Sequence, residues 1–437
     1  MRDHPGMRML DQRRFRVMQV YVLLTPILII PGLGARYFGI ADLMLPITVV
    51  LLMAGGSKLK VGHVAFGFFA IAATISTLWL STVSPTYDTS GILALVRAFA
   101  CLVPFFMAQR MGSFSNSMAE RLIATFYISG LGALAVAIFM FVFGIQGREE
   151  QQRLWYDTGE SGLRAGGLLG NSSDLGHLAA ILATVSVAFA IHFGRHALLA
   201  AVMFAISMYV TYVSSSRAAA LHILVFCAFL LPVFFARRKL RVLVTSAAVL
   251  LVTLVLAFES FGFSAAWAST FRNRFDFLNV GGQTMFFESA TRLGTWAEMT
   301  SLVGRAPFVG YGYNSTLGLV GQAGDNSFLS MLFEVGLVGG AAYAFFWVSL
   351  VLSASRARLR TDRLVGLGLV LGEIVHLLTL DGHRMWSSMP LIMLFLGVWL
   401  RLTDTRFQSP STDAPGRSTR NRRPASNAGS RSRGWVG

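Results

Sequence analysis

The chain has 437 residues, of which 54% are hydrophobic and 13% are charged, and its mean hydropathy is +0.60. This composition excludes a water-soluble globular protein and is typical of a polytopic membrane protein. The formal net charge is +16, but the basic residues follow the expected membrane topology, so this charge does not call for a nucleic-acid partner. With only two cysteines, both inside apolar segments, we expect no disulfide framework.

About twelve apolar segments are long enough to cross a hydrocarbon core of ~30 Å. Every backbone N–H and C=O must be satisfied within such a segment, so we predict that each is a helix. The segments lie near residues 17–34, 38–55, 62–82, 91–108, 121–145, 175–193, 196–213, 218–235, 240–258, 327–352, 364–380 and 386–402. The predicted fold class is therefore an all-α polytopic membrane protein with about twelve transmembrane helices within residues 17–402.

Basic residues gather in alternate gaps between these segments, and the positive-inside rule assigns those gaps to the cytoplasm. The pattern begins in the arginine-rich stretch 1–16 and ends in the tail 403–437. Both termini are therefore predicted to be cytoplasmic. The tail is rich in Ser, Arg, Asn, Gly and Pro, and we expect it to be disordered near anionic lipid headgroups. Two long loops, 146–174 and 259–325, remain on the outer face.

The second outer loop is rich in aromatic residues and contains a predicted helix from Thr291 to about Val303, with Thr291 as a candidate N-cap. One face of this helix is predicted to consist of Leu293, Trp296, Ala297 and Thr300. Arg292 lies in the first turn, where the helix dipole disfavours a cation. Arg292 is therefore either a solvated loop arginine or a residue that interacts with a group outside the helix.

Two other arginines lie where the charge rule does not expect them. Arg217 occupies a very short outer connection, and Arg97 lies ~9 Å inside the fourth segment at 1.5 Å per residue. Each has an ordinary interpretation, as a snorkelling boundary residue for Arg217 and as half of an ion pair for Arg97. Together with Arg292 they suit a lipid-linked phosphate or diphosphate, because guanidinium binds phosphate oxygens bidentately and keeps its charge when desolvated.

Asp325 directly precedes the tenth apolar segment. It is a candidate helix N-cap, a candidate general base at the membrane mouth, or both. The chain lacks Walker A, GxSxG, HExxH and D-x-D patterns, which argues against ATP-driven transport, hydrolysis and metal-dependent transfer. Histidines in or beside the segments, including His177, His222 and His376, are interpreted as packing or hydrogen-bonding residues, with His383 as a weak alternative base.

The ordered set of outer motifs resembles the O-antigen ligases and Wzy-type polysaccharide polymerases. It covers about residues 160–340. Four stretches carry the resemblance: Arg164 to Gly167 with Gly170 to Ser172; Ser216 and Arg217; Arg292 to Trp296 followed by Pro307 to Gly312; and Asp325 to Leu329 continuing through Glu334 to Gly339. Ligases of the family usually have His-Asn where this chain has Asp325 and Asn326, and this departure favours a polymerase.

The resemblance implies a C-type glycosyltransferase of the bacterial inner membrane. Its donor would be a glycan on undecaprenyl diphosphate at the periplasmic face, with no metal or other cofactor, and its acceptor a sugar hydroxyl. Arg217 and Arg292 would hold the diphosphate, and Asp325 would accept the proton of the attacking hydroxyl. The remaining candidate substrate-binding residues are Arg164, Asn171, Trp296, Asn326 and Arg97. Membrane lipids and a chain-length regulator are further expected partners.

Three alternatives stay open. An O-antigen ligase would use the same donor but transfer the glycan to lipid A core, and an oligosaccharyltransferase would transfer it to protein. A secondary transporter or flippase would favour charged residues at mid-membrane depth, and Arg97, Glu373 and His376 offer such residues.

Overall fold

A computed structural model of the chain describes most of the apolar segments. The described residues are 5–26, 29–33, 36–39, 47, 50–51, 61–83, 90–111, 114–143, 169, 172–214, 216–236, 241, 245, 248–249, 251–252, 290–321, 324–380 and 388–404. Several predicted features therefore lie largely outside the described residues: segments 38–55 and 240–258, loop 146–174 and the first half of loop 259–325. The tail beyond residue 404 lies wholly outside them.

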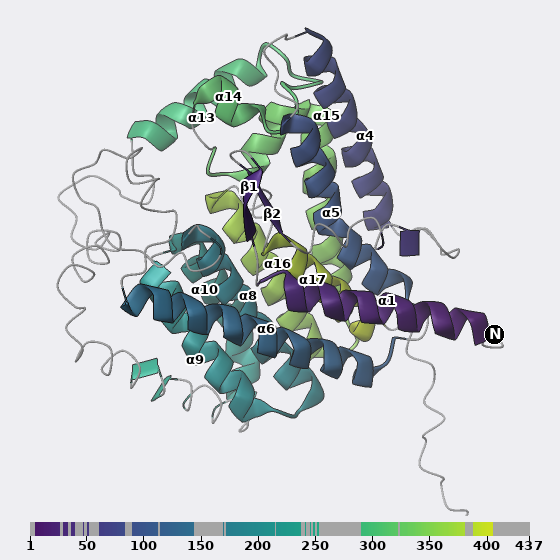
Figure 1. Cartoon of the computed structure of the whole chain (residues 1–437), viewed down its shortest axis with the longest axis vertical. Helices are drawn as coiled ribbons and strands as arrows, with labels where there is room; N and C mark the ends of the chain where they lie inside the picture. Colours follow the sequence, from purple (N-terminus) through teal and green to yellow (C-terminus); the bar gives the residue numbers. More distant parts are fainter. Residues whose placement is uncertain are drawn as a thin grey trace, which may run out of the picture.

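The described chain is helical apart from one short antiparallel hairpin (Figure 1). The helices are α1 (Pro5–Leu24), α4 (Val61–Val83), α5 (Ser90–Arg110), α6 (Asn116–Val142), α8 (Ser172–Phe193), α9 (Ala197–Ser214), α10 (Arg217–Ala236), α13 (Ala290–Val303), α14 (Ser315–Val320), α15 (Ser327–Ser355), α16 (Arg360–Thr379) and α17 (Met389–Thr403). The hairpin consists of β1 (Ile29–Leu33) and β2 (Arg36–Gly39).

Five of these helices, α6, α8, α9, α10 and α15, are long and apolar enough to cross a membrane. Shorter apolar stretches are Val64–Leu80 in α4 and Met389–Thr403, which is α17. The expectation of a helical, membrane-embedded protein is therefore confirmed at this level. The number of about twelve spans and the outer position of segment 259–325 stay predictions, although α13 and α14 make the described part of that segment largely helical.

The first predicted span, 17–34, is wrong as a single helix. α1 ends at Leu24, Thr25 Oγ1 donates a hydrogen bond to Tyr21 O (2.6 Å), and Pro26 follows. A proline cannot supply the N–H that would continue the helix. The hairpin then pairs Ile30 with Phe38, and its register shifts across the Pro31-Gly32 step. Hydropathy alone does not detect these helix-breaking residues.

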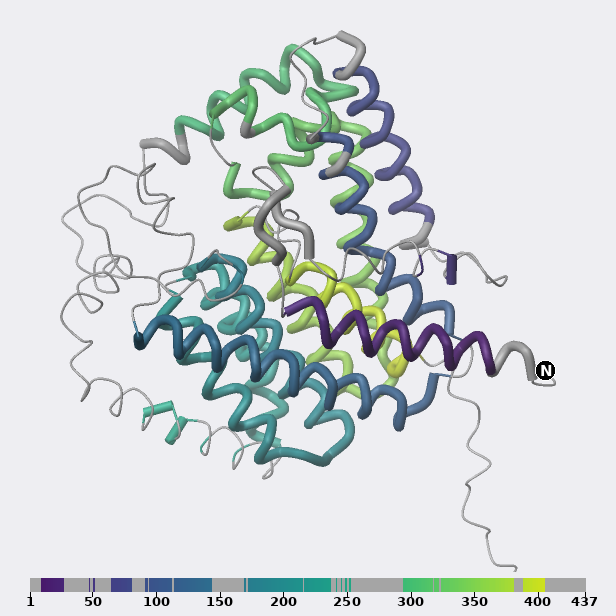
Figure 2. Tube along the Cα trace, in the orientation of Figure 1, coloured from purple at the N-terminus to yellow at the C-terminus, as the bar shows by residue number. Residues whose placement is uncertain are grey.

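The N-terminal stretch 1–16 is helical from Pro5 onward, where α1 begins. α1 packs along α6 (Figure 2). Arg14 is buried on this helix, and its Nε donates to Leu51 O (3.0 Å). Its Nη1 lies 3.4 Å from Asp11 Oδ1. A cation predicted to mark the cytoplasmic side is thus also part of the packing between α1 and its neighbours.

Helices α8 and α17 form the centre of the bundle, since nearly all of their side chains are buried. α17 packs along α5, where Gln109 Nε2 donates to Gly397 O (2.6 Å). α10 packs along α16, and α4 packs along α15. These pairings set which helix ends meet at the candidate site.

α15 is interrupted at Gly336, whose φ is +73°. The segment Pro307–Gly312 crosses the helix at this break. Tyr311 N donates to Phe333 O (3.1 Å), Gly312 N donates to Glu334 O (2.8 Å), and Leu337 N donates to Pro307 O (2.7 Å). The carbonyls of Phe333 and Glu334 and the N–H of Leu337 therefore stay hydrogen-bonded at the break, because the crossing segment supplies their partners.

Candidate functional site

Several helix ends meet at one end of the bundle, hereafter the site end. The start of α8 touches the connection between α9 and α10, because a Cβ on Gly176 would meet Ser216 Cβ and Ser214 Oγ. The start of α15 touches the end of α16, because Ser327 Oγ donates to Leu380 O (2.9 Å). Since α10 runs along α16, the starts of α8, α10 and α15 and the end of α16 share this end.

Arg217 is the first residue of α10, as the sequence predicted for a helix start. Ser216 is buried, and its Oγ lies 3.5 Å from the backbone N of Ala219, as expected of an N-cap residue. Arg217 itself is half-buried. Arg217 therefore begins α10 at the site end of the bundle.

Asp325 does not cap α15, so the helix-cap interpretation of this residue is wrong. The N-cap is Asn326, whose Oδ1 accepts hydrogen bonds from Phe328 N (3.1 Å) and Leu329 N (3.0 Å). Asp325 precedes it in a left-handed conformation with φ +49°. Asp and Asn are equally good caps, so propensity did not decide between neighbouring positions. The Asp325 carboxylate remains the candidate base.

Trp296 joins the helix of Arg292 to the turn of Asp325. Its indole Nε1 donates to Gly324 O (2.6 Å), directly before Asp325. A Cβ on Gly324 would lie 3.2 Å from Met299 Cε, so α13 also packs closely on this turn. Arg292 stands one turn before Trp296 on α13; its side chain lies outside the described ones.

Of the predicted face of α13, Trp296 is half-buried, Ala297 and Thr300 are exposed, and the side chain of Leu293 lies outside the described ones. Among the described side chains of α13, the buried ones are Thr295 and Met299 on the adjoining side. Thr291 is not the cap, since α13 begins at Ala290. The predicted end at Val303 is confirmed. The side that packs on Gly324 and α15 determines the buried stripe.

Arg97 also lies towards the site end. It is buried, with 5% of its surface exposed, on α5 next to Ala98. Ala98 and Cys101 share a pocket with Met389 at the start of α17, whereas Gln109 contacts Gly397 farther along α17. α5 and α17 therefore run in the same direction. Arg164 and Asn171 lie outside the described residues.

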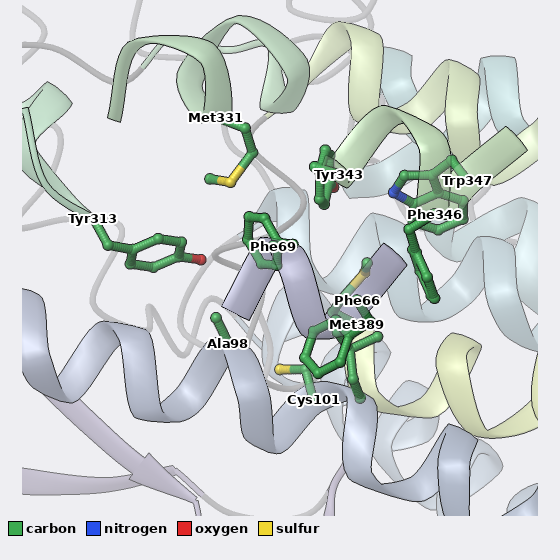
Figure 3. Close-up of a pocket in the computed structure, with 11 residues that line it drawn as sticks. Phe66, Phe69, Ala98, Cys101, Tyr313, Met331, Tyr343, Phe346, Trp347 and Met389 are labelled. Carbon is green, nitrogen blue, oxygen red and sulfur yellow. The ribbon is translucent and has the colours of Figure 1, made fainter. Parts of the chain in front are cut away.

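An apolar pocket opens beside the start of α17 (Figure 3). Phe66 and Phe69 from α4 face Tyr343 and Trp347 from α15, with Cys101 from α5 below them. The other lining residues are Ala98, Leu102, Tyr313, Met331, Phe346 and Met389. Its walls are aromatic and aliphatic and offer little to a charged ligand.

A buried polar cluster lies just below the site end. The sequence indicated Glu373 and His376 as polar residues at mid-membrane depth but did not join them to His177 and His222. His177 of α8, His222 of α10, Glu373 and His376 of α16 all have 0% of their surface exposed. His177 Nε2 lies 2.9 Å from Glu373 Oε2, and His222 Nδ1 lies 3.4 Å from the same oxygen. The rings of His177 and His376 stack with centroids 3.9 Å apart.

Ser388, directly before α17, completes this cluster through a 2.8 Å hydrogen bond with His177 Nδ1. The available sequence signal was the Glu373-x-x-His376 spacing, which puts both side chains on one face of a helix. Each histidine had been interpreted separately as a packing or hydrogen-bonding residue, and the hydrogen bonds of His177 confirm the second role for that residue. Their meeting depends on three helices that hydropathy does not place relative to one another.

No protein-family model matches this chain, and no curated protein matches it.

Proposed function

We propose that the protein is a polysaccharide polymerase of the bacterial inner membrane, with both termini in the cytoplasm. It would transfer a glycan from undecaprenyl diphosphate to a sugar hydroxyl at the periplasmic face. The observation that carries this proposal is the convergence at one helix-bundle end of Arg217, the Asp325 turn and the helix bearing Arg292. Two cationic positions and one carboxylate are the groups that this transfer needs.

In the proposed reaction, the acceptor hydroxyl gives its proton to the Asp325 carboxylate as its oxygen bonds to the anomeric carbon of the donor. The bond between that carbon and the diphosphate oxygen breaks, and undecaprenyl diphosphate leaves with the electron pair. Arg217 and Arg292 stabilise the charge that develops on the diphosphate. Asp325 is half-buried and is not the cap of α15, and its carboxylate, unlike the neighbouring Asn326 amide, can accept a proton.

The positioning of these groups also supports the proposal. The Trp296 hydrogen bond holds α13 on the Asp325 turn, and the segment Pro307–Gly312 is held across α15 by three backbone hydrogen bonds. Arg97, Arg164 and Asn171 remain candidate contacts of donor or acceptor glycan.

The proposal is tested in a deletion strain complemented with wild type, Arg217→Ala, Arg217→Lys or the control Arg195→Ala. Arg195 is exposed at the far end of α8 and lies 3.8 Å from Glu120. We expect single lipid-linked repeats to accumulate with Arg217→Ala. The yield of polymer with Arg217→Lys should be at least ~10-fold below that of wild type, because lysine keeps the charge but loses the bidentate geometry. Arg195→Ala should make normal polymer.

The competing functions give different results in the same strains. Normal-length polymer that stays on undecaprenyl diphosphate indicates a ligase for lipid A core, and loss of glycosylated protein indicates an oligosaccharyltransferase. Unchanged glycan in every strain refutes transfer and favours the transporter. Equal polymer from wild type and Arg217→Ala refutes the assigned role of Arg217.

A further inference from the structure

We propose that the buried cluster of His177, Glu373 and His376 is a binding site for a divalent transition-metal ion of the zinc class, with His222 packed beside it. The site lies apart from the proposed chemistry and does not depend on it. The sequence had suggested no metal site.

The donor set is that of a zinc site. Imidazole nitrogens and a carboxylate oxygen are common Zn²⁺ ligands, at ~2.0–2.2 Å from the ion. One donor atom from each of His177, Glu373 and His376 lies within 4.8 Å of the others. Tetrahedral ligands at such bond lengths are roughly 3.4 Å apart. Around an ion the pair His177 Nε2 and Glu373 Oε2, now 2.9 Å apart, would open slightly, and the more distant donors would close by about 1 Å.

Several buried atoms of the cluster are unsatisfied without an ion. Among the described residues, neither ring nitrogen of His376 has a hydrogen-bond partner, and the same is true of His222 Nε2 and Glu373 Oε1. Burying polar groups unpaired is costly, and most buried polar atoms in proteins are therefore bonded. One bound cation satisfies donor atoms from several helices at once and balances the Glu373 carboxylate.

The His177 ring is already held as metal-ligating histidines usually are. Its Nδ1 is hydrogen-bonded to Ser388 Oγ at 2.8 Å, which turns Nε2 towards Glu373. A hydrogen bond at the second ring nitrogen fixes the ring orientation of a ligand and raises its basicity. Close approach of α10 and α16 also shapes the site, since a Cβ on Gly372 would lie 2.8 Å from His222 Cδ2.

An ion at this position would join α8 to α16, and α10 as well where His222 ligates. The site lies near Arg217, since His222 follows Arg217 by five residues, or ~7.5 Å along α10. Three protein ligands leave the fourth tetrahedral position to water or to movement of His222, and because the three come from two helices the ion would hold those helices together. Its expected effect is therefore on the stability and relative position of these helix ends.

The first test measures the metal content of the full-length protein, purified in detergent without chelators, by inductively coupled plasma mass spectrometry. We expect about one zinc per chain in wild type and a fall of at least ~10-fold in Glu373→Gln and His376→Gln. The matched control is His192→Gln, because His192 is on the same helix as His177 but pairs with Asp362 at 3.3 Å. The control should keep wild-type zinc. No zinc in wild type, or equal zinc in all four proteins, overturns the proposal.

A second measurement does not require the variants to fold. Wild-type protein is stripped with a chelator, and its thermal unfolding is followed before and after addition of Zn²⁺ or Mg²⁺. A site that binds in the folded state raises the unfolding midpoint, so we expect a rise with Zn²⁺ and none with Mg²⁺. If the midpoint is unchanged and no Zn²⁺ is taken up, the cluster is held by hydrogen bonds between its own side chains, and the proposal fails.

Discussion

Gly310→Ala should destabilise the protein strongly, because Gly310 lies where Pro307–Gly312 crosses the break in α15. Its φ is +74°, and a Cβ there would lie 2.5 Å from Gly336 N and 2.6 Å from Glu334 O. The left-handed conformation costs a residue with a β-carbon ~1–2 kcal/mol. Displacing the segment also weakens the Tyr311 and Gly312 backbone bonds to α15, at ~1 kcal/mol each. The expected loss is about 3–4 kcal/mol.

The assay is thermal unfolding of the purified protein, followed by tryptophan fluorescence. The matched control is Gly318→Ala in α14, where a Cβ would meet no described atom within 4 Å. Alanine favours a helix interior by ~0.8–1.0 kcal/mol over glycine, so this control should unfold at or slightly above the wild-type temperature. Gly310→Ala should unfold several degrees lower. Equal midpoints for the two variants would refute the argument that the crossing has no room for a side chain.

Two further predictions separate structural from chemical roles at the site end. Asn326→Ala should lower stability by ~1 kcal/mol through loss of the α15 cap. Asp325→Asn should unfold at the wild-type temperature, since Asn tolerates positive φ, but it should form no polymer. Normal polymer from Asp325→Asn would exclude Asp325 as the base. Trp296→Phe removes the hydrogen bond to Gly324 O and should cost ~1 kcal/mol of stability and reduce polymer yield roughly tenfold. Wild-type yield and unfolding midpoint for Trp296→Phe would show that this bond does not position α13.

The sequence predicted α13 well but not its buried face. A helical pattern ending at Val303 depends on local propensity and on Gly304, so its end was predictable. The buried stripe through Thr295 and Met299 depends instead on which side meets Gly324. The same limit applies to Asp325 and Asn326, because both residue types cap helices and only the backbone conformation distinguishes them.

Hydropathy also did not detect the break after the first helix. Apolar length alone predicted one span over 17–34, although Pro26, Pro31 and Gly32 stand within it. Proline and glycine are tolerated in membrane helices where neighbours satisfy the backbone, so their presence was not decisive in advance. Here the helix ends before Pro26 and a hairpin follows.

The sequence by itself determined that the protein is helical and membrane-embedded, because apolar segments of this length must satisfy their backbone internally. It also indicated Arg217 as a helix start. Only the tertiary structure decided that Glu373 would meet His177, 196 residues earlier in the chain, and that Gly310 would lie against Gly336. Propensity and hydropathy act along the chain, whereas such meetings depend on how separate helices pack and at what register.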